Sequence, residues 1–217
     1  MASYLILGAG KFGRLALERL ARQDPGATFG VVDRDRAALA AAQAGNNQRG
    51  QFHRQEAADF LTGRLDQSPW DWLIPMVPVH VAWAYLLAKP QVGRDWETAT
   101  VPDVVGQGVP EVQRGPRGEL YLSRARHLCP DDCQPGPVCP VSGESRELPL
   151  YEQLAAMVVP GFEMLVIVSR QLAPGVGGYP PRQLGALARD LGRCRGQALI
   201  ATACCCHGVV HGLARRG

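Results

Sequence analysis

A short apolar run, a glycine-rich turn and a helical pattern follow one another at the start of the chain, and no other feature restricts the fold more. The run "YLIL" (4–7) predicts a buried strand, and "RLALERLAR" (14–22) has apolar residues at helical spacing. "GAGKFG" stands between them, and "TFGVVDRD" (28–35) predicts a second strand. A strand, a tight turn, a helix and another strand form a unit whose two strands lie parallel in one sheet.

The same alternation continues along most of the chain. Up to residue 89 it predicts further strands at 50–54 and 71–77 and helices at 36–44, 56–65 and 79–88. From 90 to 150 Pro, Gly and Cys are frequent, and only "ELYLSR" (119–124) predicts a strand. A short helix is then expected at 151–158, followed by a strand at 162–169, a helix at 180–192, a strand at 197–203 and a helix at 207–216.

This pattern predicts an α/β protein built on a Rossmann-like, doubly wound parallel sheet of six strands. We expect residues 1–89 to form a dinucleotide-binding βαβ core and 90–150 a cysteine-bearing Pro/Gly-rich insertion. Residues 151–217 would add βαβα and complete the same sheet. A separate C-terminal domain is the alternative.

The turn "GAGKFG" has the spacing of a dinucleotide-binding loop. Gly8 would permit the tight turn, Gly10 would let the backbone approach a pyrophosphate, and Gly13 would let the helix pack on the strand. Lys11 and Phe12 lie within the loop, where the helix N-terminus offers free N–H groups to phosphates. A mononucleotide, or no ligand, is the alternative.

An acidic residue ends the second predicted strand. Asp33 lies 20 residues after Gly13, close to the separation expected for a carboxylate that binds the ribose hydroxyls. Such a carboxylate repels a 2′-phosphate, which favours NAD over NADP. Arg34, the next residue, leaves NADP as the alternative cofactor.

The segments "ILGAGKFGRLALERL" and "VVDRD" resemble the NAD-binding domain of potassium-uptake regulators, the TrkA-N or RCK type. The Phe before the third glycine and the "VVDRD" strand end carry this resemblance, which covers about the first 90 residues. It implies a Rossmann-type nucleotide domain. The whole chain also resembles an uncharacterised bacterial family with a "CPDDC" segment, an "SRQLAPGVGGY" loop and a C-terminal "CHG", and that resemblance implies no function.

Three cysteines lie close together in the insertion. Cys129, Cys133 and Cys139 are surrounded by prolines, which lower the entropy lost when thiols gather around an ion. Their spacing matches neither the usual zinc rule nor the usual iron–sulfur rule in full. Metal ligation by the three is nevertheless the preferred interpretation, with unligated loop cysteines as the alternative.

A fourth ligand is expected from "CCCHG" (204–208), which follows the last predicted strand. We predict Cys206, at the junction with the final predicted helix, with Cys204 and His207 as alternatives. Cys205 and Cys194 are expected to be buried apolar residues. Thiolates suit both Zn²⁺ and a [4Fe–4S] cluster, and the proline-rich segment slightly favours zinc.

Three further residues are candidates for chemistry. His80 follows the fourth strand, where the nicotinamide pocket is expected, so it could act as an acid–base group, or simply pack or cap a helix. In "SRQLAPGVGGYPP" (169–181), Arg170 could bind an anionic substrate group and Tyr179 could close over it, unless the loop is only structural.

Composition limits the classes of partner. The net charge of +3 is too small to indicate nucleic acid, and no run of about 20 apolar residues predicts a membrane span. The start does not resemble a signal peptide, so a cytoplasmic protein is expected, in which seven reduced cysteines favour metal or redox chemistry. The sequence therefore favours an NAD-dependent oxidoreductase with a small-molecule substrate. A sensor that binds a small effector without turnover is the alternative, and a homo-oligomer remains open.

Overall fold

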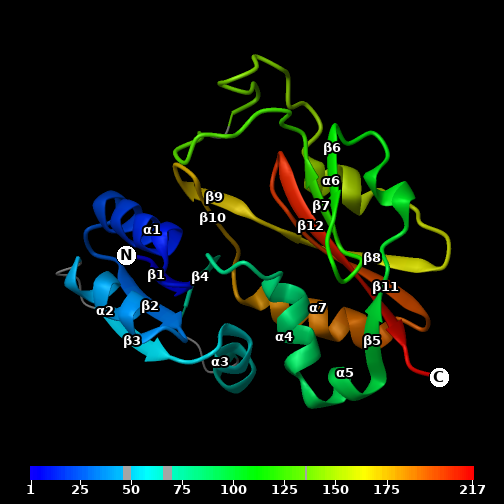
Figure 1. Ribbon diagram of the computed structural model, residues 1–217, viewed down its shortest axis with the longest axis horizontal. Helices are drawn as coiled ribbons and strands as arrows, with labels where there is room; N and C mark the ends of the chain where they lie inside the picture. The colour runs from blue at the N-terminus through cyan, green and yellow to red at the C-terminus, as the bar shows by residue number, and fades with distance from the viewer. Residues whose placement is uncertain (46–49, 66–69, 135) are drawn as a thin grey trace.

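The computed structural model describes residues 1–45, 50–65, 70–134 and 136–217. It is a mixed α/β structure with two main sheets, one from the first 75 residues and one from later parts of the chain (Figure 1). Among the described residues, no helix is long and apolar enough to cross a membrane.

The first sheet has four parallel strands in the order β3-β2-β1-β4. Its strands are β1 (Ser3–Leu7), β2 (Thr28–Asp33), β3 (Gly50–Arg54) and β4 (Trp72–Pro75). All four confirm predicted strands. β1, β2 and β4 are short apolar runs that can be buried on both faces, whereas β3 is a partly exposed edge strand.

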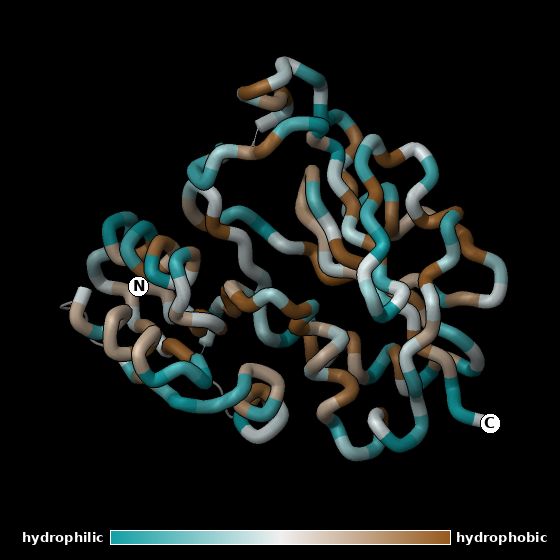
Figure 2. The backbone as a smooth tube through the Cα atoms, in the orientation of Figure 1, coloured by the Kyte–Doolittle hydropathy of each residue, from teal (hydrophilic) through white to brown (hydrophobic). Residues whose placement is uncertain are grey.

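Helices cover both faces of this sheet. Ile6 on one face packs with residues of α1 (Lys11–Gln23) and α2 (Arg36–Ala44). Leu5 and Leu7 on the other face pack with α3 (Ala57–Arg64) and α4 (Val81–Ala88). Along α1 the backbone in Figure 2 alternates between hydrophilic and hydrophobic residues, as expected when one side of a helix is buried.

The second sheet is mixed and runs β6-β7-β12-β11-β8, with β5 also paired to β12. Strands β8 and β11 are parallel, whereas β12 is antiparallel to β11, β7 and β5. The strands are β5 (Trp96–Ala99), β6 (Glu111–Arg114), β7 (Leu120–Ser123), β8 (Phe162–Val168), β11 (Gln197–Ala203) and β12 (His207–Arg215). The prediction that later strands complete one six-stranded parallel sheet is therefore wrong.

The segment predicted as the final helix is β12. Gly208 and Gly212 disfavour a helix, and in the sheet they allow close approach of neighbouring residues. A Cβ at Gly212 would lie 2.5 Å from the carbonyl oxygen of Ala99 on β5. Pairing with three strands outweighs the local helical spacing of apolar residues on which the prediction rested.

Further helices and a small hairpin lie outside the two main sheets. They are α5 (Pro90–Asp95), α6 (Leu150–Ala155), β9 (Arg170–Ala173), β10 (Val176–Gly178) and α7 (Arg182–Arg193). Leu73 on β4 exchanges backbone hydrogen bonds of 2.9 and 3.0 Å with Tyr179, just after β10. One hydrophobic cluster contains Leu7 from the first sheet and Ile200 from the second, so the two sheets share a core.

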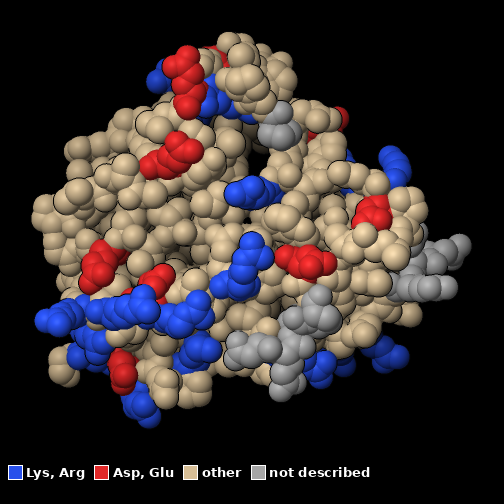
Figure 3. Space-filling view, turned by 180° about the vertical axis from the view of Figure 1, so that it is seen from behind, with Lys and Arg blue, Asp and Glu red and all other residues tan. Residues whose placement is uncertain are grey.

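Charges of both signs are interspersed on the surface. Lys and Arg side chains gather at the end of the molecule near the C-terminus, with Asp and Glu among them (Figure 3). Arg193 lies 3.2 Å from Asp190, and Arg216 lies 3.9 Å from Glu97. The basic side chains are thus partly neutralised locally, in keeping with the small net charge.

Candidate functional site

The glycine loop lies at the carboxyl end of β1. Gly8 has a φ of +103°, and a Cβ there would stand 2.5 Å from the carbonyl oxygen of Met76. A Cβ at Gly13 would stand 1.9 Å from the oxygen of Gly8, whereas a Cβ at Gly10 would have nothing within 4 Å. Tight turning and close packing therefore require glycine at 8 and 13, and the position of Gly10 is open.

Asp33 binds the glycine loop itself. Its carboxylate accepts hydrogen bonds from the N–H groups of Ala9 at 2.7 Å and Asp35 at 2.8 Å. Arg34 pairs with Glu56 at 3.2 Å. The structure thus gives Asp33 a structural task, bracing the loop, that the spacing rule does not reveal.

The loop from β7 to α6 (124–149), called the cysteine loop below, docks beside the glycine loop. Lys11 pairs with Asp131 at 2.9 Å, and Arg19 donates to the carbonyl oxygen of Asp131 at 2.7 Å. Phe12 is exposed, with the Lys11 ammonium 5.0 Å from its ring centre. Helix α1 therefore holds the segment that was predicted to bind metal.

A second set of contacts ties the cysteine loop to the β9–β10 hairpin. The carbonyl oxygen of Cys133 accepts from the Gln171 side chain at 2.5 Å and from the Gly175 N–H at 3.1 Å. A Cβ at Gly175, where φ is +65°, would stand 1.7 Å from the oxygen of Asp131. Only glycine at 175 allows the loop to come this close.

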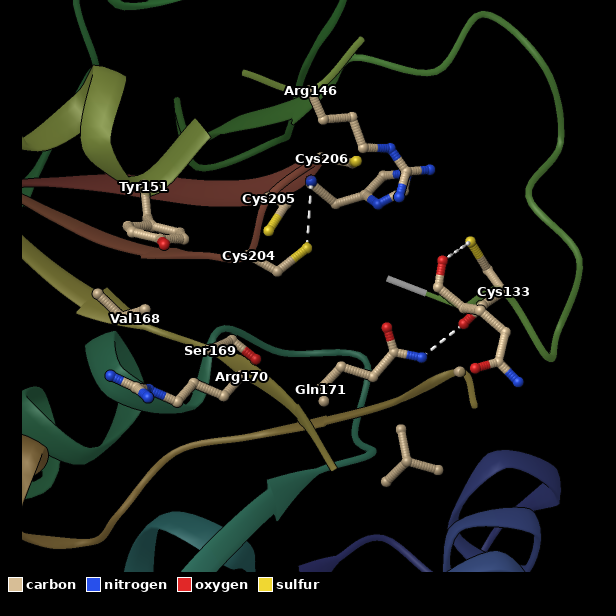
Figure 4. Close-up of a pocket in the computed structure, with 15 residues that line it drawn as sticks. Cys133, Arg146, Tyr151, Val168, Ser169, Arg170, Gln171, Cys204, Cys205 and Cys206 are labelled. Atoms are coloured by element: carbon tan, nitrogen blue, oxygen red, sulfur yellow. Dashed lines mark hydrogen bonds between the residues drawn. The ribbon is translucent and has the colours of Figure 1, made fainter. Parts of the chain in front are cut away.

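The cysteine loop and the turn Cys204–Cys206, called the triple-cysteine turn, face each other across a cavity of about 450 Å³. In Figure 4, Cys133 lies on one side and the three consecutive cysteines on the other, with Arg146 beside Cys206 and Tyr151 nearest Cys205. The two segments are far apart in the sequence, and their convergence agrees with the predicted placement of the loop at this turn.

Two cysteine–histidine contacts accompany this convergence. Cys129 Sγ lies 3.7 Å from His207 Nε2, and Cys139 Sγ lies 3.8 Å from His127 Nε2. Within the described ranges, however, no three His, Cys, Asp or Glu side chains are arranged so that they could hold a metal ion. The metal centre of Cys129, Cys133, Cys139 and Cys206 therefore stays a prediction that needs side chains to turn inward.

The thiols differ in acidity. Hydrogen bonds from the Ser142 side chain and from the N–H groups of Ser142 and Val141 lower the pKa of Cys139 to about 6. Burial raises the pKa of Cys204, but hydrogen bonds from His207 and from the backbone leave it below the usual value. Burial raises the pKa of Cys206 to about 11. Cys139 and Cys204 are thus the thiols most readily present as thiolates.

Arg146 stands among these thiols and was not predicted. Burial lowers the pKa of its guanidinium, but the thiols of Cys139, Cys206 and Cys133 leave it above the usual value, and its own charge lowers the pKa of Cys206. A single arginine in "GESRELP" carries no motif, so only the folded chain reveals this counter-ion.

His80 lies at a second hollow, a groove of about 520 Å³ that shares Ser169, Cys204 and His207 with the first cavity. The residue is only 6% exposed. Its Nε2 lies 2.9 Å from Thr202 Oγ1, and its Nδ1 lies 3.1 Å from His211 Nδ1. Burial and the neighbouring His211 hold the pKa of His80 well below 6.5. The sequence carries no signal for His211 or for its buried contact with His80.

The two candidate substrate residues are separated by the fold. Arg170 is exposed and lines the first cavity (Figure 4). Tyr179 is 1% exposed, lies in the shared core, and its hydroxyl has no hydrogen-bond partner among the described residues. The expectation that Tyr179 closes over a ligand is therefore wrong, because its backbone pairing with Leu73 draws the ring inward.

Comparisons with known proteins place the chain among uncharacterised relatives. Residues 70–216 match the family model AF_1314_C, described as "Uncharacterized protein, C-terminal domain". The chain is also 27% identical over 222 residues to an "Uncharacterized protein" of Archaeoglobus fulgidus, with 97% of this chain and 99% of the relative covered. The family model spans β4, the cysteine loop and the second sheet, and the glycine loop precedes its first residue.

Proposed function

For this chain, which belongs to the family of the AF_1314_C domain, we propose a dinucleotide-dependent oxidoreductase whose cleft carries a cysteine-ligated metal centre. The nucleotide would lie on the glycine loop, and a small-molecule substrate would enter the groove beside His80. The observation that carries the proposal is the contact between the glycine loop and the cysteine loop, made by Lys11 and Asp131.

The first sheet supports dinucleotide binding. Its order β3-β2-β1-β4 is that of the first four strands of doubly wound, Rossmann-type nucleotide domains. Helix α1 begins directly after Gly10, which caps it without a side-chain hydrogen bond, so its first N–H groups can serve a phosphate. The open space at the Gly10 Cβ position agrees with close approach by a pyrophosphate.

The surroundings of Asp33 favour NAD over NADP. The carboxylate is fixed at the carboxyl end of β2 by two backbone N–H groups, where it would repel a 2′-phosphate. Arg34, which could attract that phosphate, already pairs with Glu56.

The thiols could serve a metal as ligands after a local rearrangement. Cys129, Cys139 and Cys206 line one small cavity with Arg146, and Cys133 and Cys206 line the larger cavity with the same arginine. The acidic Cys139 favours metal binding, because ligating sulfur must be deprotonated. Zn²⁺ would brace the cysteine loop, whereas a [4Fe–4S] cluster would carry electrons, and Cys204 and His207 remain the alternative fourth ligands.

Calorimetry tests the nucleotide site. NAD⁺ should bind more tightly than NADP⁺, and Gly10→Val should abolish binding of both while the melting temperature stays near that of the wild type. Gly63→Val is the matched control, because Gly63 is an exposed helical glycine whose Cβ position is also open. Equal NAD⁺ affinity in Gly10→Val and Gly63→Val would contradict the site.

Elemental analysis and a visible spectrum of anaerobically purified protein test the metal centre. Zinc or iron should be present at a fixed ratio to protein and fall towards zero in Cys129→Ser and Cys206→Ser. Cys194→Ser is the control, because Cys194 is 1% exposed within the hydrophobic core. Full occupancy in Cys206→Ser would remove this residue from the ligand set.

A sensor without turnover is the second candidate. The hydrogen bonds that Lys11 and Arg19 make to Asp131 favour it, since they link the nucleotide helix directly to the cysteine loop. A screen for NADH oxidation with aldehydes, ketones and 2-oxo acids separates the two functions. NADH binding without turnover on any of these compounds would favour the sensor.

A further inference from the structure

A chain of buried polar groups runs from the core to the groove beside β4. Thr202 on β11 contacts His80 at the start of α4, and His80 contacts His211 on β12 through Nδ1–Nδ1. These residues come from three elements that are distant in the sequence, and both imidazoles are at least 94% buried. Burying two imidazoles costs free energy unless their ring nitrogens have hydrogen-bond partners. Here one nitrogen of His80 contacts His211 and the other contacts Thr202.

Charged and aromatic groups complete the surroundings of His211. Trp83 stacks on its ring with centroids 4.6 Å apart. Glu119, 1% exposed, accepts from the Arg117 N–H at 2.8 Å and the Tyr121 hydroxyl at 3.3 Å. Burial lowers the pKa of His211 to about 4, the Glu119 carboxylate opposes this, and Arg117 adds to it. Both histidines are therefore neutral near pH 7, and each carries one ring proton.

Two neutral imidazoles in Nδ1–Nδ1 contact allow two arrangements. With a proton on His211 Nδ1, His80 carries its proton on Nε2 and donates it to Thr202, whose own proton then points into the groove. With the proton on His80 Nδ1, the Thr202 hydroxyl donates to His80 Nε2 and offers oxygen lone pairs to the groove. Moving between the arrangements converts Thr202 from a proton donor to a proton acceptor.

The groove is placed where the second half of a dinucleotide would reach. Val77 lines it, and the Cγ1 atom of Val77 lies 3.1 Å from the Cβ position of Gly8 in the glycine loop. Most of its wall is apolar, which disfavours a charged substrate. The apolar and aromatic lining residues are Val77, Pro78, Val79, Tyr121, Ala203 and Val209.

We propose that Thr202, backed by His80 and His211, is the acid–base group of this groove, and that the substrate is an uncharged, apolar aldehyde or ketone. The inference rests on the proposed oxidoreductase function. A bound NADH would supply hydride to the carbonyl carbon, and Thr202 gives its proton to the carbonyl oxygen. Thr202 recovers a proton from His80 Nε2, His80 Nδ1 takes one from His211, and water replaces it at the other nitrogen of His211. NADH, the carbonyl compound and one proton thus give NAD⁺ and an alcohol.

Thr202→Val tests the catalytic hydroxyl, since valine keeps the β-branched shape of a strand residue. With NADH and a panel of aldehydes, ketones and 2-oxo acids, kcat should fall about 10²-fold or more while the Kd for NADH is unchanged. Thr202→Ser should recover most of the rate. Thr62→Val is the control, because the Thr62 hydroxyl donates to the Ala58 carbonyl oxygen on α3 and does not line the groove. His80→Gln and His211→Gln should lower kcat and change its pH profile, which a purely structural role would not do.

Each outcome distinguishes the inference from the function on which it rests. Full activity in Thr202→Val overturns the acid–base assignment alone. Preference for 2-oxo acids over apolar aldehydes and ketones overturns the substrate class. NADH binding without turnover by the wild type overturns the inference and the oxidoreductase together, and absence of NADH binding overturns the nucleotide site.

Discussion

Acidification should destabilise the protein through the buried histidine pair. The pKa of His211 is about 4 in the folded chain and about 6.5 when unfolded, so the unfolded chain takes up protons first as the pH falls. The contribution of neutral, buried His211 to the free energy of unfolding is complete above pH 6.5 and is lost between pH 6.5 and about 4. At pH 5, 1.5 units below the unfolded value, His211 alone should cost about 2 kcal/mol of unfolding free energy.

His80 acts in the same direction, because its pKa is also lowered by burial and by His211. Protonating both rings would also place two N–H groups face to face across the 3.1 Å Nδ1–Nδ1 contact. The loss between pH 7 and pH 5 should therefore exceed the value for His211 alone.

Urea titrations at pH 7.0, 6.0 and 5.0, followed by tryptophan fluorescence, measure this loss. Trp83 stacks on His211 and reports directly on the pair. His211→Gln should be less stable than the wild type at pH 7 but should lose clearly less free energy between pH 7 and pH 5. His127→Gln, a change outside the pair, should keep the wild-type pH dependence. Equal stability of the wild type at pH 7 and pH 5 would refute the reasoning.

Three other outcomes follow from contacts in the structure. Gly8→Ala should lower the unfolding free energy by about 1–3 kcal/mol, because of the positive φ and the clash with Met76. Gly10→Ala should change it by no more than about 1 kcal/mol. Thermal melts measure both variants, and equal melting temperatures would contradict this difference. Gly175→Ala should push the cysteine loop off the β9–β10 hairpin, seen as faster proteolysis between residues 124 and 149, and unchanged cleavage would show that the contact is not needed. Cys194, 1% exposed and with a pKa raised to about 12 by burial, should resist iodoacetamide in the native protein and react after unfolding; native labelling at the rate of Cys129 would count against its burial.

Sequence alone determined the first sheet. Strands β1, β2 and β4 and the helices of this half follow from local apolar patterns, and glycine at 8 and 13 follows from the turn that joins β1 to α1. These features depend on residues within a few positions of one another, so periodicity and turn chemistry are sufficient to predict them. The convergence of the cysteine loop and the triple-cysteine turn was also expected, although a metal was the reason given.

Tertiary structure decided the rest. Residues 207–215 became β12 because three neighbouring strands satisfy its backbone, a contribution that helical spacing cannot represent. Tyr179 lies in the core for a similar reason, because its backbone pairs with that of Leu73. The Arg146 counter-ion and the His80–His211 contact join side chains across the fold, the latter over 131 positions. Such pairs leave no spacing in the sequence, since their distance is set only when the two sheets close on a common core.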